Sequence, residues 1–343
     1  MTGPRATEMR DIALPEAGPG DGLLRVEVTG VCEFDAQRYR RGDIAPAILG
    51  HEIVGVLERV GQDMAVRWGV SAGDRVLVEE YVPCLDCEWC ARGEHRLCEA
   101  AQLDAPAAIR YGATPLSRAP GLWGGFAEAI YLHPRSVLHA VPTDMPADIA
   151  ALAVPLANGV QWAVFDGGAA PGKTVLILGG NRYGAAAALA AKHAGAREVL
   201  LGVTGAEAKT RPATDADFVF DVEEGDFRDA AMAATGGRGA DVVVDATSDT
   251  SGQVAAGAIA VAAKGGILVL GGVGTVPLNL GEIRRKYLTV KPVRSHSYAA
   301  TQRALDILRA PQTAFVTGQE IFPLSAVDQA LRARARHCLV VPN

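Results

Sequence analysis

The chain has 343 residues, of which 49% are hydrophobic and 21% charged, a composition typical of folded globular proteins rather than disordered ones. Its formal net charge of −6 argues against general binding to nucleic acid or to an anionic membrane. At about 150 residues per domain, the length favours two domains. No stretch approaches the roughly 18 uninterrupted apolar residues of a membrane span, and no signal peptide begins the chain. We therefore expect a cytoplasmic protein with reduced thiols.

The first 150 residues contain short β-type runs separated by glycine, proline and aspartate. Leu23–Val28, Ile53–Val60 and Arg75–Val78 are each too short for a good helix. This part of the chain is therefore predicted to be an irregular, mostly β domain. It also contains Cys32 and the pair His51-Glu52. Taken alone these are weak site candidates, because a single thiol or imidazole usually has a structural role.

Four of the six cysteines, Cys84, Cys87, Cys90 and Cys98, lie within 15 positions in the spacing C-x2-C-x2-C-x7-C. Tetrahedral zinc needs four thiolates at about 2.3 Å from the metal, and tight C-x2-C turns present sulfurs to a common point. A chance cluster of buried thiols is one alternative. A redox C-x2-C pair is another, but it would leave two cysteines without a role. We predict one structural zinc ion, because an all-cysteine shell leaves no position for water.

From about residue 155, apolar runs alternate with helix-like stretches. The strand candidates are Thr174–Leu178, Val199–Val203, Asp217–Asp221, Asp241–Ala246 and Ile267–Leu270, and the helix candidates are Ala185–Ala194, Phe227–Ala234 and Gln253–Ala262. This alternation predicts a parallel sheet with helices on both faces. After about residue 290 the pattern loosens, with a helix-like Thr301–Arg309 and an apolar Leu339–Val341, which is compatible with a tail that returns to the first domain.

A glycine turn follows the first strand of this second half and opens a helix. Its six residues are Gly179, Gly180, Asn181, Arg182, Tyr183 and Gly184. In a strand–turn–helix setting, such glycines let the backbone approach a pyrophosphate, whose charge meets the amides of the helix N-terminus. Asn181 replaces the middle glycine of G-x-G-x-x-G, so the bare pattern also fits an ordinary turn. Its place inside a run of βαβ units favours a dinucleotide site.

Together these features resemble the zinc-containing medium-chain dehydrogenase/reductase family, the alcohol and polyol dehydrogenases. The resemblance covers nearly the whole chain, and it rests on Gly30-Val31-Cys32, Gly50-His51-Glu52, Gly73–Val76, the four-cysteine lobe, Gly124–Glu128, Thr235–Val242 and the glycine pairs Gly265-Gly266 and Gly271-Gly272. It implies an α/β protein with a GroES-like, β-rich catalytic domain, residues 1–154 and 291–343, and a Rossmann domain with a doubly wound parallel sheet, residues 155–290. It places the active site in the cleft between them. There a catalytic zinc polarises the substrate oxygen while nicotinamide exchanges a hydride with the carbon.

Two departures from the family pattern affect the chemistry. Phe34 replaces the Ser or Thr that usually passes the alcohol proton, and Val154 stands where a third zinc ligand is usual. Because valine cannot bind zinc, we expect Glu52 to act in its place. Cys32, His51 and Glu52 are then the catalytic-site residues and the ligands of a weakened second zinc site. The alternative is a buried Cys32 thiol with no metal.

A third departure affects the cofactor. The acidic residue expected after the second Rossmann strand is replaced by Thr204, and Lys209 and Arg211 follow. Without a carboxylate to repel a 2′-phosphate, these residues favour NADP(H) over NAD(H). We expect them to bind the cofactor together with the glycine turn, Gly271 and Gly272.

The predicted function is NAD(P)-dependent hydride transfer to or from a small organic substrate, with alcohol–carbonyl interconversion as the family default. One alternative is reduction of an activated C=C or C=N bond, for which no alkoxide proton relay is needed. Another is a non-catalytic, nucleotide-binding relative. The resemblance also implies a homodimer or homotetramer paired through the region Val269–Asn279, with no nucleic-acid or membrane partner.

Overall fold

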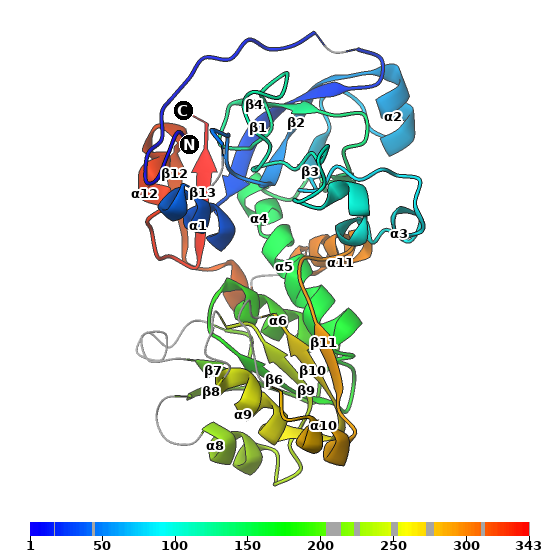
Figure 1. Cartoon of the computed structure of the whole chain (residues 1–343), viewed down its shortest axis with the longest axis vertical. Helices are drawn as coiled ribbons and strands as arrows, with labels where there is room; N and C mark the ends of the chain where they lie inside the picture. Colours follow the sequence, from blue (N-terminus) through cyan, green and yellow to red (C-terminus); the bar gives the residue numbers. More distant parts are fainter. Residues whose placement is uncertain are drawn as a thin grey trace. The chain divides into compact units, whose positions relative to one another are not determined.

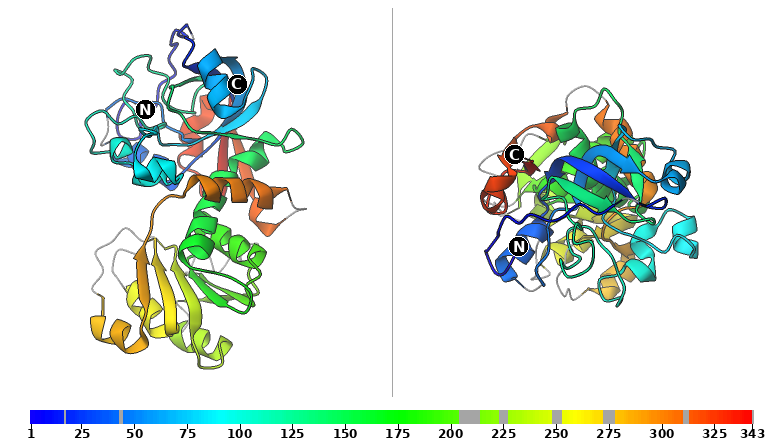
Figure 2. Two further views of the ribbon diagram at one scale, coloured as in Figure 1. Left: turned by 90° about the vertical axis from the view of Figure 1, so that its right-hand side faces the viewer. Right: turned by 90° about the horizontal axis from the view of Figure 1, so that it is seen from above.

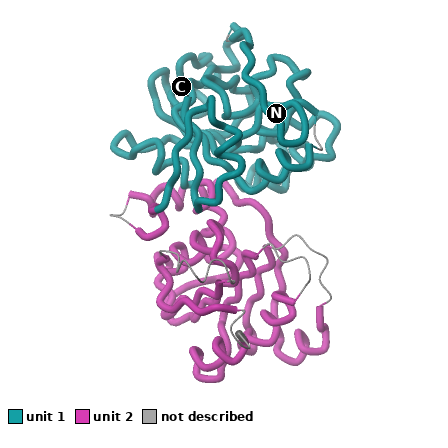
Figure 3. The backbone as a smooth tube through the Cα atoms, turned by 90° about the vertical axis from the view of Figure 1, so that its left-hand side faces the viewer, with its two compact units in different colours: residues 1–153, 318–343 teal, residues 154–317 magenta. Residues whose placement is uncertain are grey.

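Figure 1 shows the computed structural model of the chain, which describes residues 1–16, 18–42, 45–203, 214–222, 227–247, 253–271, 278–309 and 313–342. The chain forms two compact units (Figure 3). Unit 1 comprises Met1–Ala153 and Gly318–Asn343, and unit 2 comprises Val154–Thr317.

Unit 1 is built on a seven-stranded sheet in the order β12-β13-β1-β2-β3-β5, with β4 paired to β1. Its strands are β1 Gly22–Gly30, β2 Glu52–Val60, β3 Arg75–Val78, β4 Ala129–Leu132, β5 Leu138–Ala140, β12 Gln319–Pro323 and β13 His337–Val341. Alternate side chains of β1 and β2, such as Leu24, Val26 and Ile53, pack with Trp123 in the core of this unit. The antiparallel pairing of β1 with β13 sets Thr29 opposite Val340. The predicted return of the tail to the first domain is therefore confirmed.

The helices of unit 1 are short and lie around this sheet. They are α1 Glu33–Arg41, α2 Gln62–Trp68, α3 Glu88–Ala91, α4 Ala147–Ala151 and α12 Val327–Ala330, with 3₁₀ turns η1 His95–Leu97, η2 Glu99–Ala101 and η5 Leu324–Ala326. Helix α1 has acidic residues in its first turn and Arg38, Arg40 and Arg41 in its last, as the helix dipole favours. It ends at Gly42, whose φ of 62° is the left-handed conformation of a helix C-cap.

Unit 2 has a six-stranded parallel sheet in the order β11-β10-β9-β6-β7-β8. The left view of Figure 2 shows strands of this sheet, coloured from green to orange, lying side by side. The strands are β6 Thr174–Leu178, β7 Glu198–Val203, β8 Phe218–Asp221, β9 Ala240–Asp245, β10 Ala262–Leu270 and β11 Thr289–Pro292. The helical segments are α5 Ala153–Gly159, the π-helical η3 Val160–Asp166, α6 Arg182–His193, α8 Phe227–Ala234, α9 Gln253–Val261, α10 Leu280–Lys286, α11 Tyr298–Leu308 and the 3₁₀ turn η4 Ala314–Val316.

Both faces of the unit 2 sheet are covered by helices. Val175 and Ile177 of β6 pack with Ala187 of α6 in one apolar cluster. Leu176 and Leu178, which alternate with them along the same strand, pack with residues of α9 in another. This two-sided burial produces the continuous apolar run of β6 and confirms the predicted doubly wound α/β architecture.

The boundary between the units differs from the prediction at its second point, because residues 291–317 group with unit 2. Strand β11 pairs in parallel with β10, setting Leu270 opposite Pro292. Helix α11 follows, and its N-cap Ser297 donates its hydroxyl hydrogen to Gln161 Oε1 at 2.8 Å. These contacts hold the segment in unit 2 until the chain reaches Gly318.

One helical run, Ala147–Asp166, is long and apolar enough to cross a membrane by length and composition alone, with a mean hydropathy of 1.3. Within this run, 78% of the 18-residue window that gives this hydropathy is buried inside the protein. The run is therefore weak evidence for a membrane span, because the core helix of a folded domain has the same properties.

Candidate functional site

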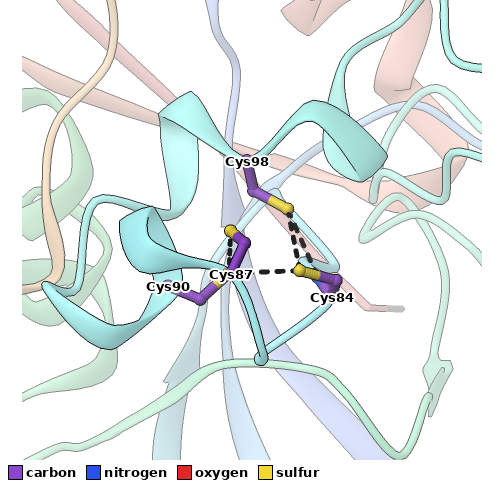
Figure 4. A group of neighbouring side chains, drawn as sticks. All are labelled: Cys84, Cys87, Cys90 and Cys98. Carbon is purple, nitrogen blue, oxygen red and sulfur yellow. Dashed lines mark hydrogen bonds between the residues drawn. The ribbon is translucent and has the colours of Figure 1, made fainter.

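The four clustered cysteines converge on one point in unit 1 (Figure 4). The Sγ–Sγ distances are 3.5 Å for Cys98–Cys84, 3.5 Å for Cys87–Cys90 and 3.8 Å for Cys84–Cys90. A tetrahedron with metal–sulfur bonds of about 2.3 Å has sulfur–sulfur edges of about 3.8 Å. All six cysteines of the chain are free thiols, so no disulfide competes for these sulfurs. The spacing therefore fits a closed zinc shell.

Local backbone geometry brings these sulfurs together. Leu85 adopts the left-handed conformation with φ 69°, which closes the turn between Cys84 and Cys87. Cys87 then caps α3, and Cys90 lies within that helix. The backbone N–H of Cys90 lowers the pKa of the Cys87 thiol to about 7, which favours the thiolate that binds metal.

A second group of possible metal ligands is formed by Cys32, His51 and Glu52. One ligand atom from each lies within 4.8 Å of the others, and all three side chains are buried. Cys32 is the N-cap of α1, and its Sγ accepts the backbone N–H of Phe34 at 3.5 Å. Thiolate, imidazole and carboxylate are the donor types of catalytic zinc sites, so this set fits such an ion.

Glu52 reaches this group because β1 ends in a glycine. Gly30 lies opposite Glu52 in the β1–β2 pairing. A Cβ at Gly30 would lie 2.1 Å from Glu52 Oε2, so any other residue there would displace the carboxylate. Val154, the position of the usual third ligand, lies in α5 of unit 2 and offers no donor atom.

Asp35 is a buried residue of this candidate site that the sequence analysis missed. Its side chain is fully buried, and its two carboxylate oxygens accept the backbone N–H groups of Cys32 at 3.0 Å and Gly50 at 3.1 Å. Its Oδ1 lies 3.6 Å from His51 Nδ1, which is electrostatic contact rather than a hydrogen bond. The spacing Cys32-x-x-Asp35 is that of a capping box, and this signal could have identified it.

The charge of Asp35 determines the protonation of His51. Burial alone would lower the pKa of His51, but the Asp35 carboxylate, followed by that of Glu80, raises it well above the ordinary value. Burial likewise opposes ionisation of Asp35, yet His51 and the two backbone donors keep the pKa of this carboxyl below its usual range. Asp35 is therefore a buried anion that faces one edge of the imidazole and favours its protonated form, and a metal bound at the other nitrogen would have to replace the proton there.

The glycine turn lies at the carboxyl end of β6 in unit 2. Gly179 has φ 108°, and a Cβ at Gly184 would lie 1.8 Å from Gly179 O. These two glycines therefore allow the close approach of strand and helix that dinucleotide turns require. Strands β6 and β9 are neighbours at the point where the strand order reverses, which is where ligands bind in open α/β sheets. Gly180 and Arg182 are buried, and Tyr183 is half-buried.

Asn181 has a different role from the glycine that it replaces. Its Oδ1 accepts the backbone N–H groups of Tyr183 at 2.9 Å and Gly184 at 3.1 Å, so it caps α6. Its Nδ2 donates to Ala246 O at 2.6 Å, which ties the turn to the end of β9. Two of the helix N-terminal amides expected to meet the pyrophosphate are thus bonded to a side chain in this structure.

The remaining cofactor-binding candidates are divided between described and undescribed parts of the chain. Gly271 directly follows β10, where its N–H donates to Asp245 O at 2.8 Å. A Cβ there would lie 2.9 Å from a ring carbon of Trp162. Thr204, Lys209, Arg211 and Gly272 lie outside the described residues.

Comparison with known proteins gives two family matches. Residues 18–143 match the alcohol dehydrogenase GroES-like domain, and residues 184–310 match the zinc-binding dehydrogenase domain. These ranges include both groups of possible metal ligands and Gly184, the last residue of the glycine turn.

Three relatives are similar over most of the chain. A Mycobacterium tuberculosis protein named "Probable alcohol dehydrogenase adh" is 40% identical over 279 residues, which cover 79% of this chain and 74% of that protein. The erythritol/L-threitol dehydrogenase of Mycolicibacterium smegmatis is 31% identical over 262 residues, which cover 73% of this chain and 69% of that protein. A solved zinc-binding dehydrogenase from Sinorhizobium meliloti, bound to NADP, has a TM-score of 0.81 and 25% identity and covers 97% of this chain and 95% of its own.

Proposed function

The chain belongs to the zinc-dependent medium-chain dehydrogenase/reductase family, and on this basis we propose that it interconverts an alcohol and a carbonyl compound with NAD(P)(H). The observation that carries this proposal is the buried convergence of Cys32, His51 and Glu52 in unit 1. The doubly wound sheet with its glycine turn supplies the cofactor-binding half. The similar proteins are named as alcohol and polyol dehydrogenases, which does not favour the alternative reduction of C=C or C=N bonds.

We propose that Cys32, His51 and Glu52 hold a second zinc ion, more weakly than the four cysteines hold theirs. When bound, this ion would act as a Lewis acid on the substrate oxygen. The residues around it have separate tasks. Asp35 fixes the orientation of His51, and Gly30 leaves room for the Glu52 carboxylate. Burial of all three ligands keeps bulk water from most of the site and strengthens electrostatic interactions within it.

The proton of the alcohol needs a route that Phe34 does not provide. The family places a hydroxyl at this position, whereas the phenyl ring has no exchangeable proton. The Phe34 ring is 44% exposed and lies against the Arg38 guanidinium, 4.5 Å from the ring centroid. We propose that the oxidation of plain alcohols is slow because this side-chain relay is missing.

We propose NADP(H) as the preferred cofactor over NAD(H). Its support is the chemistry of the sequence after β7, where Thr204 stands in place of an acidic residue and Lys209 and Arg211 follow. A neutral hydroxyl does not repel a 2′-phosphate, and two cations attract it. Direct comparison of the dissociation constants of NADPH and NADH tests this preference.

We further propose a cytoplasmic homodimer or homotetramer that acts on a small molecule and has no nucleic-acid or membrane partner. Family resemblance supports pairing through Val269–Asn279, of which residues 272–277 lie outside the described chain. Light scattering that gives a monomer mass at micromolar concentration would contradict the assembly.

The activity is tested by following NADPH and NADH oxidation with a panel of aldehydes, ketones, enones and cyclic imines. We expect turnover of an aldehyde or ketone that is lost in Cys32→Ala. Turnover confined to enones or imines would contradict alcohol–carbonyl interconversion. No turnover of any compound, with NADPH still bound, would favour a non-catalytic relative.

A further inference from the structure

A cavity of about 450 Å³ lies beside α1 in unit 1. Its wall includes Phe34, Arg38 and Arg41 of α1 together with Leu103 and Pro115. The volume is that of a site for a small organic molecule. Its wall combines an aromatic ring and an aliphatic side chain with cationic groups, which is the composition of a site for a carbon chain that carries a negative charge.

Arg38 is the unusual member of this wall. Arg38 is only 5% exposed, and within the described part of the chain its guanidinium makes one hydrogen bond, from Nη1 to Gly112 O at 2.9 Å. Among the described residues, no carboxylate oxygen lies within 4.0 Å of its guanidinium nitrogens. A buried guanidinium normally pairs with an anion, because desolvation of an unpaired charge is costly.

The charges of two carboxylates, Asp35 and Glu80, act on Arg38, but each of these groups is already bonded to other partners. Asp35 accepts the backbone N–H groups of Cys32 and Gly50. Glu80 is ion-paired with Arg110. Burial lowers the pKa of Arg38, and the more distant charges of Asp35 and Glu80 act in the opposite direction. Arg38 therefore keeps a positive charge with donor capacity to spare.

This charge lies close to the proposed zinc ligands. Phe34, which borders the cavity, donates its N–H to Cys32 Sγ at 3.5 Å. Gly112, whose carbonyl holds Arg38, packs on His51, since a Cβ at Gly112 would lie 3.2 Å from His51 Cβ. The wall of the cavity and the proposed ligands are thus formed by directly adjoining residues.

We propose that Arg38 is a specificity-determining residue, which binds a carboxylate or phosphate group at the far end of the alcohol or carbonyl substrate. Phe34 and Leu103 contact the carbon chain between that group and the reacting carbon. Arginine suits this task because its planar fork can donate two parallel hydrogen bonds to either oxyanion. The inference rests on the proposed function and names the substrate class of that same site.

The test compares each anionic substrate with a neutral counterpart in the zinc-loaded, full-length protein. The carboxylate arm uses 4-oxobutanoate and its methyl ester, and the phosphate arm uses glycolaldehyde phosphate and glycolaldehyde. In at least one arm we expect kcat/KM for the anion to exceed that of its neutral partner at least tenfold. Arg38→Gln removes this preference by raising KM for the anionic substrate, so that the ratio of the two kcat/KM values falls toward one, as expected for loss of a charge-assisted hydrogen bond.

Arg40→Gln is the matched control, because Arg40 lies on the same helix but is exposed and paired with Glu33. It leaves all four rates unchanged. A wild-type protein without anion preference in either arm would overturn the proposal, as would an Arg38→Gln variant that loses acid and ester turnover equally. If the Gln variant does not fold, Arg38→Lys serves instead, and an unchanged preference there would overturn the guanidinium assignment.

A binding measurement separates this inference from the proposed function. Calorimetry with succinate and with inorganic phosphate needs no turnover. We expect at least one of them to bind the wild-type protein and to bind Arg38→Gln at least tenfold more weakly. If this holds while no aldehyde reacts, the inference stands and the proposed activity fails. If neutral aldehydes react but neither anion binds, the activity stands and the inference fails.

Discussion

Asp35 Oδ1 lies 3.6 Å from His51 Nδ1, at the N-terminus of the helix that Cys32 caps. The same carboxylate accepts the backbone N–H groups of Cys32 and Gly50. One buried anion thus holds the backbone at Cys32 and at Gly50, the residue before His51. Cys32 and His51 are two of the proposed zinc ligands. The positions of Cys32 and His51 are therefore coupled through Asp35.

Asp35→Asn is expected to lose the second zinc ion. An amide keeps the shape of the side chain but removes the charge that orients and polarises His51, and outer-shell partners of this kind are worth about 10- to 100-fold in metal affinity or activity. Elemental analysis should fall from two zinc ions per chain toward one. Asp63→Asn, on the exposed side of α2, is the control and retains both. Unchanged zinc and activity in Asp35→Asn would refute the positioning role.

Cys87→Ala is expected to lose the zinc of the four-cysteine group. Because binding of a structural metal is coupled to folding, the variant should also unfold at a lower temperature. Cys338→Ala is the matched control, since Cys338 is a buried cysteine that forms no disulfide and lies outside the cluster. It should keep its zinc. A Cys87→Ala protein with wild-type zinc content and thermal stability would contradict a closed metal shell.

Phe34→Ser is expected to accelerate oxidation of a plain alcohol such as 1-butanol. A hydroxyl at this position can pass the proton that the phenyl ring cannot, and general acid–base groups contribute about 10²- to 10⁴-fold. Phe34→Ala removes the same ring without adding a hydroxyl. A steady-state rate of alcohol oxidation that rises in Phe34→Ser but not in Phe34→Ala supports the missing relay. An equal rise in both variants would show instead that the ring obstructs the substrate.

Arg211→Ala is expected to weaken NADPH binding and to leave NADH binding unchanged. The predicted contact is with the 2′-phosphate, which only NADPH carries. Fluorescence titration of both cofactors gives the two dissociation constants, with Arg309→Ala as a cationic control at the end of α11. Equal weakening of both cofactors, or tighter NADH than NADPH binding in the wild type, would count against the NADP(H) preference.

His133 makes unit 1 sensitive to acid. Burial, followed by the charges of Arg135 and Arg118, lowers the pKa of His133 from 6.5 to about 4. Its neutral Nδ1 accepts the backbone N–H of Arg135 at 3.1 Å, a bond that protonation would break. In the unfolded chain the imidazole takes up its proton near pH 6.5, whereas the folded state resists protonation until about pH 4.

The free energy of unfolding is therefore expected to decrease as the pH falls from about 6.5 to about 4. His133→Asn keeps a side-chain acceptor for Arg135 but does not titrate. Denaturant unfolding at pH 7 and pH 5 should show a smaller loss of stability in this variant than in the wild type. Equal losses would assign the acid sensitivity to other groups.

The sequence alone predicted most of the described strands within a few residues, but of the helices only α6, α8, α9 and α11. Thr174–Leu178 coincides with β6, and Arg75–Val78 coincides with β3. These runs could be recognised because the local composition and the spacing of apolar residues follow directly from the burial of one or both faces of a strand or helix. The four-cysteine group was equally accessible, since its geometry is imposed by turns within 15 neighbouring positions.

Other features depended on contacts between distant segments. The prediction assigned residues 291–317 to the first domain, whereas the structure groups them with unit 2. No local pattern in that stretch indicates that β11 pairs with β10. In the sequence, Asn181 makes the glycine motif imperfect. In the structure its side chain caps α6 and donates a hydrogen bond to Ala246 O, 65 residues further along the chain.

The sequence by itself thus determined the α/β architecture, the family and the candidate metal-binding side chains, because each depends on residue type and short-range spacing. Only the tertiary structure decided that Asp35 contacts His51, that Gly30 makes room for Glu52, and that Arg38 is buried beside them without a carboxylate partner among the described residues. Burial and charge compensation are properties of what surrounds a side chain. They arise when segments far apart in the chain pack together, and no local pattern encodes them.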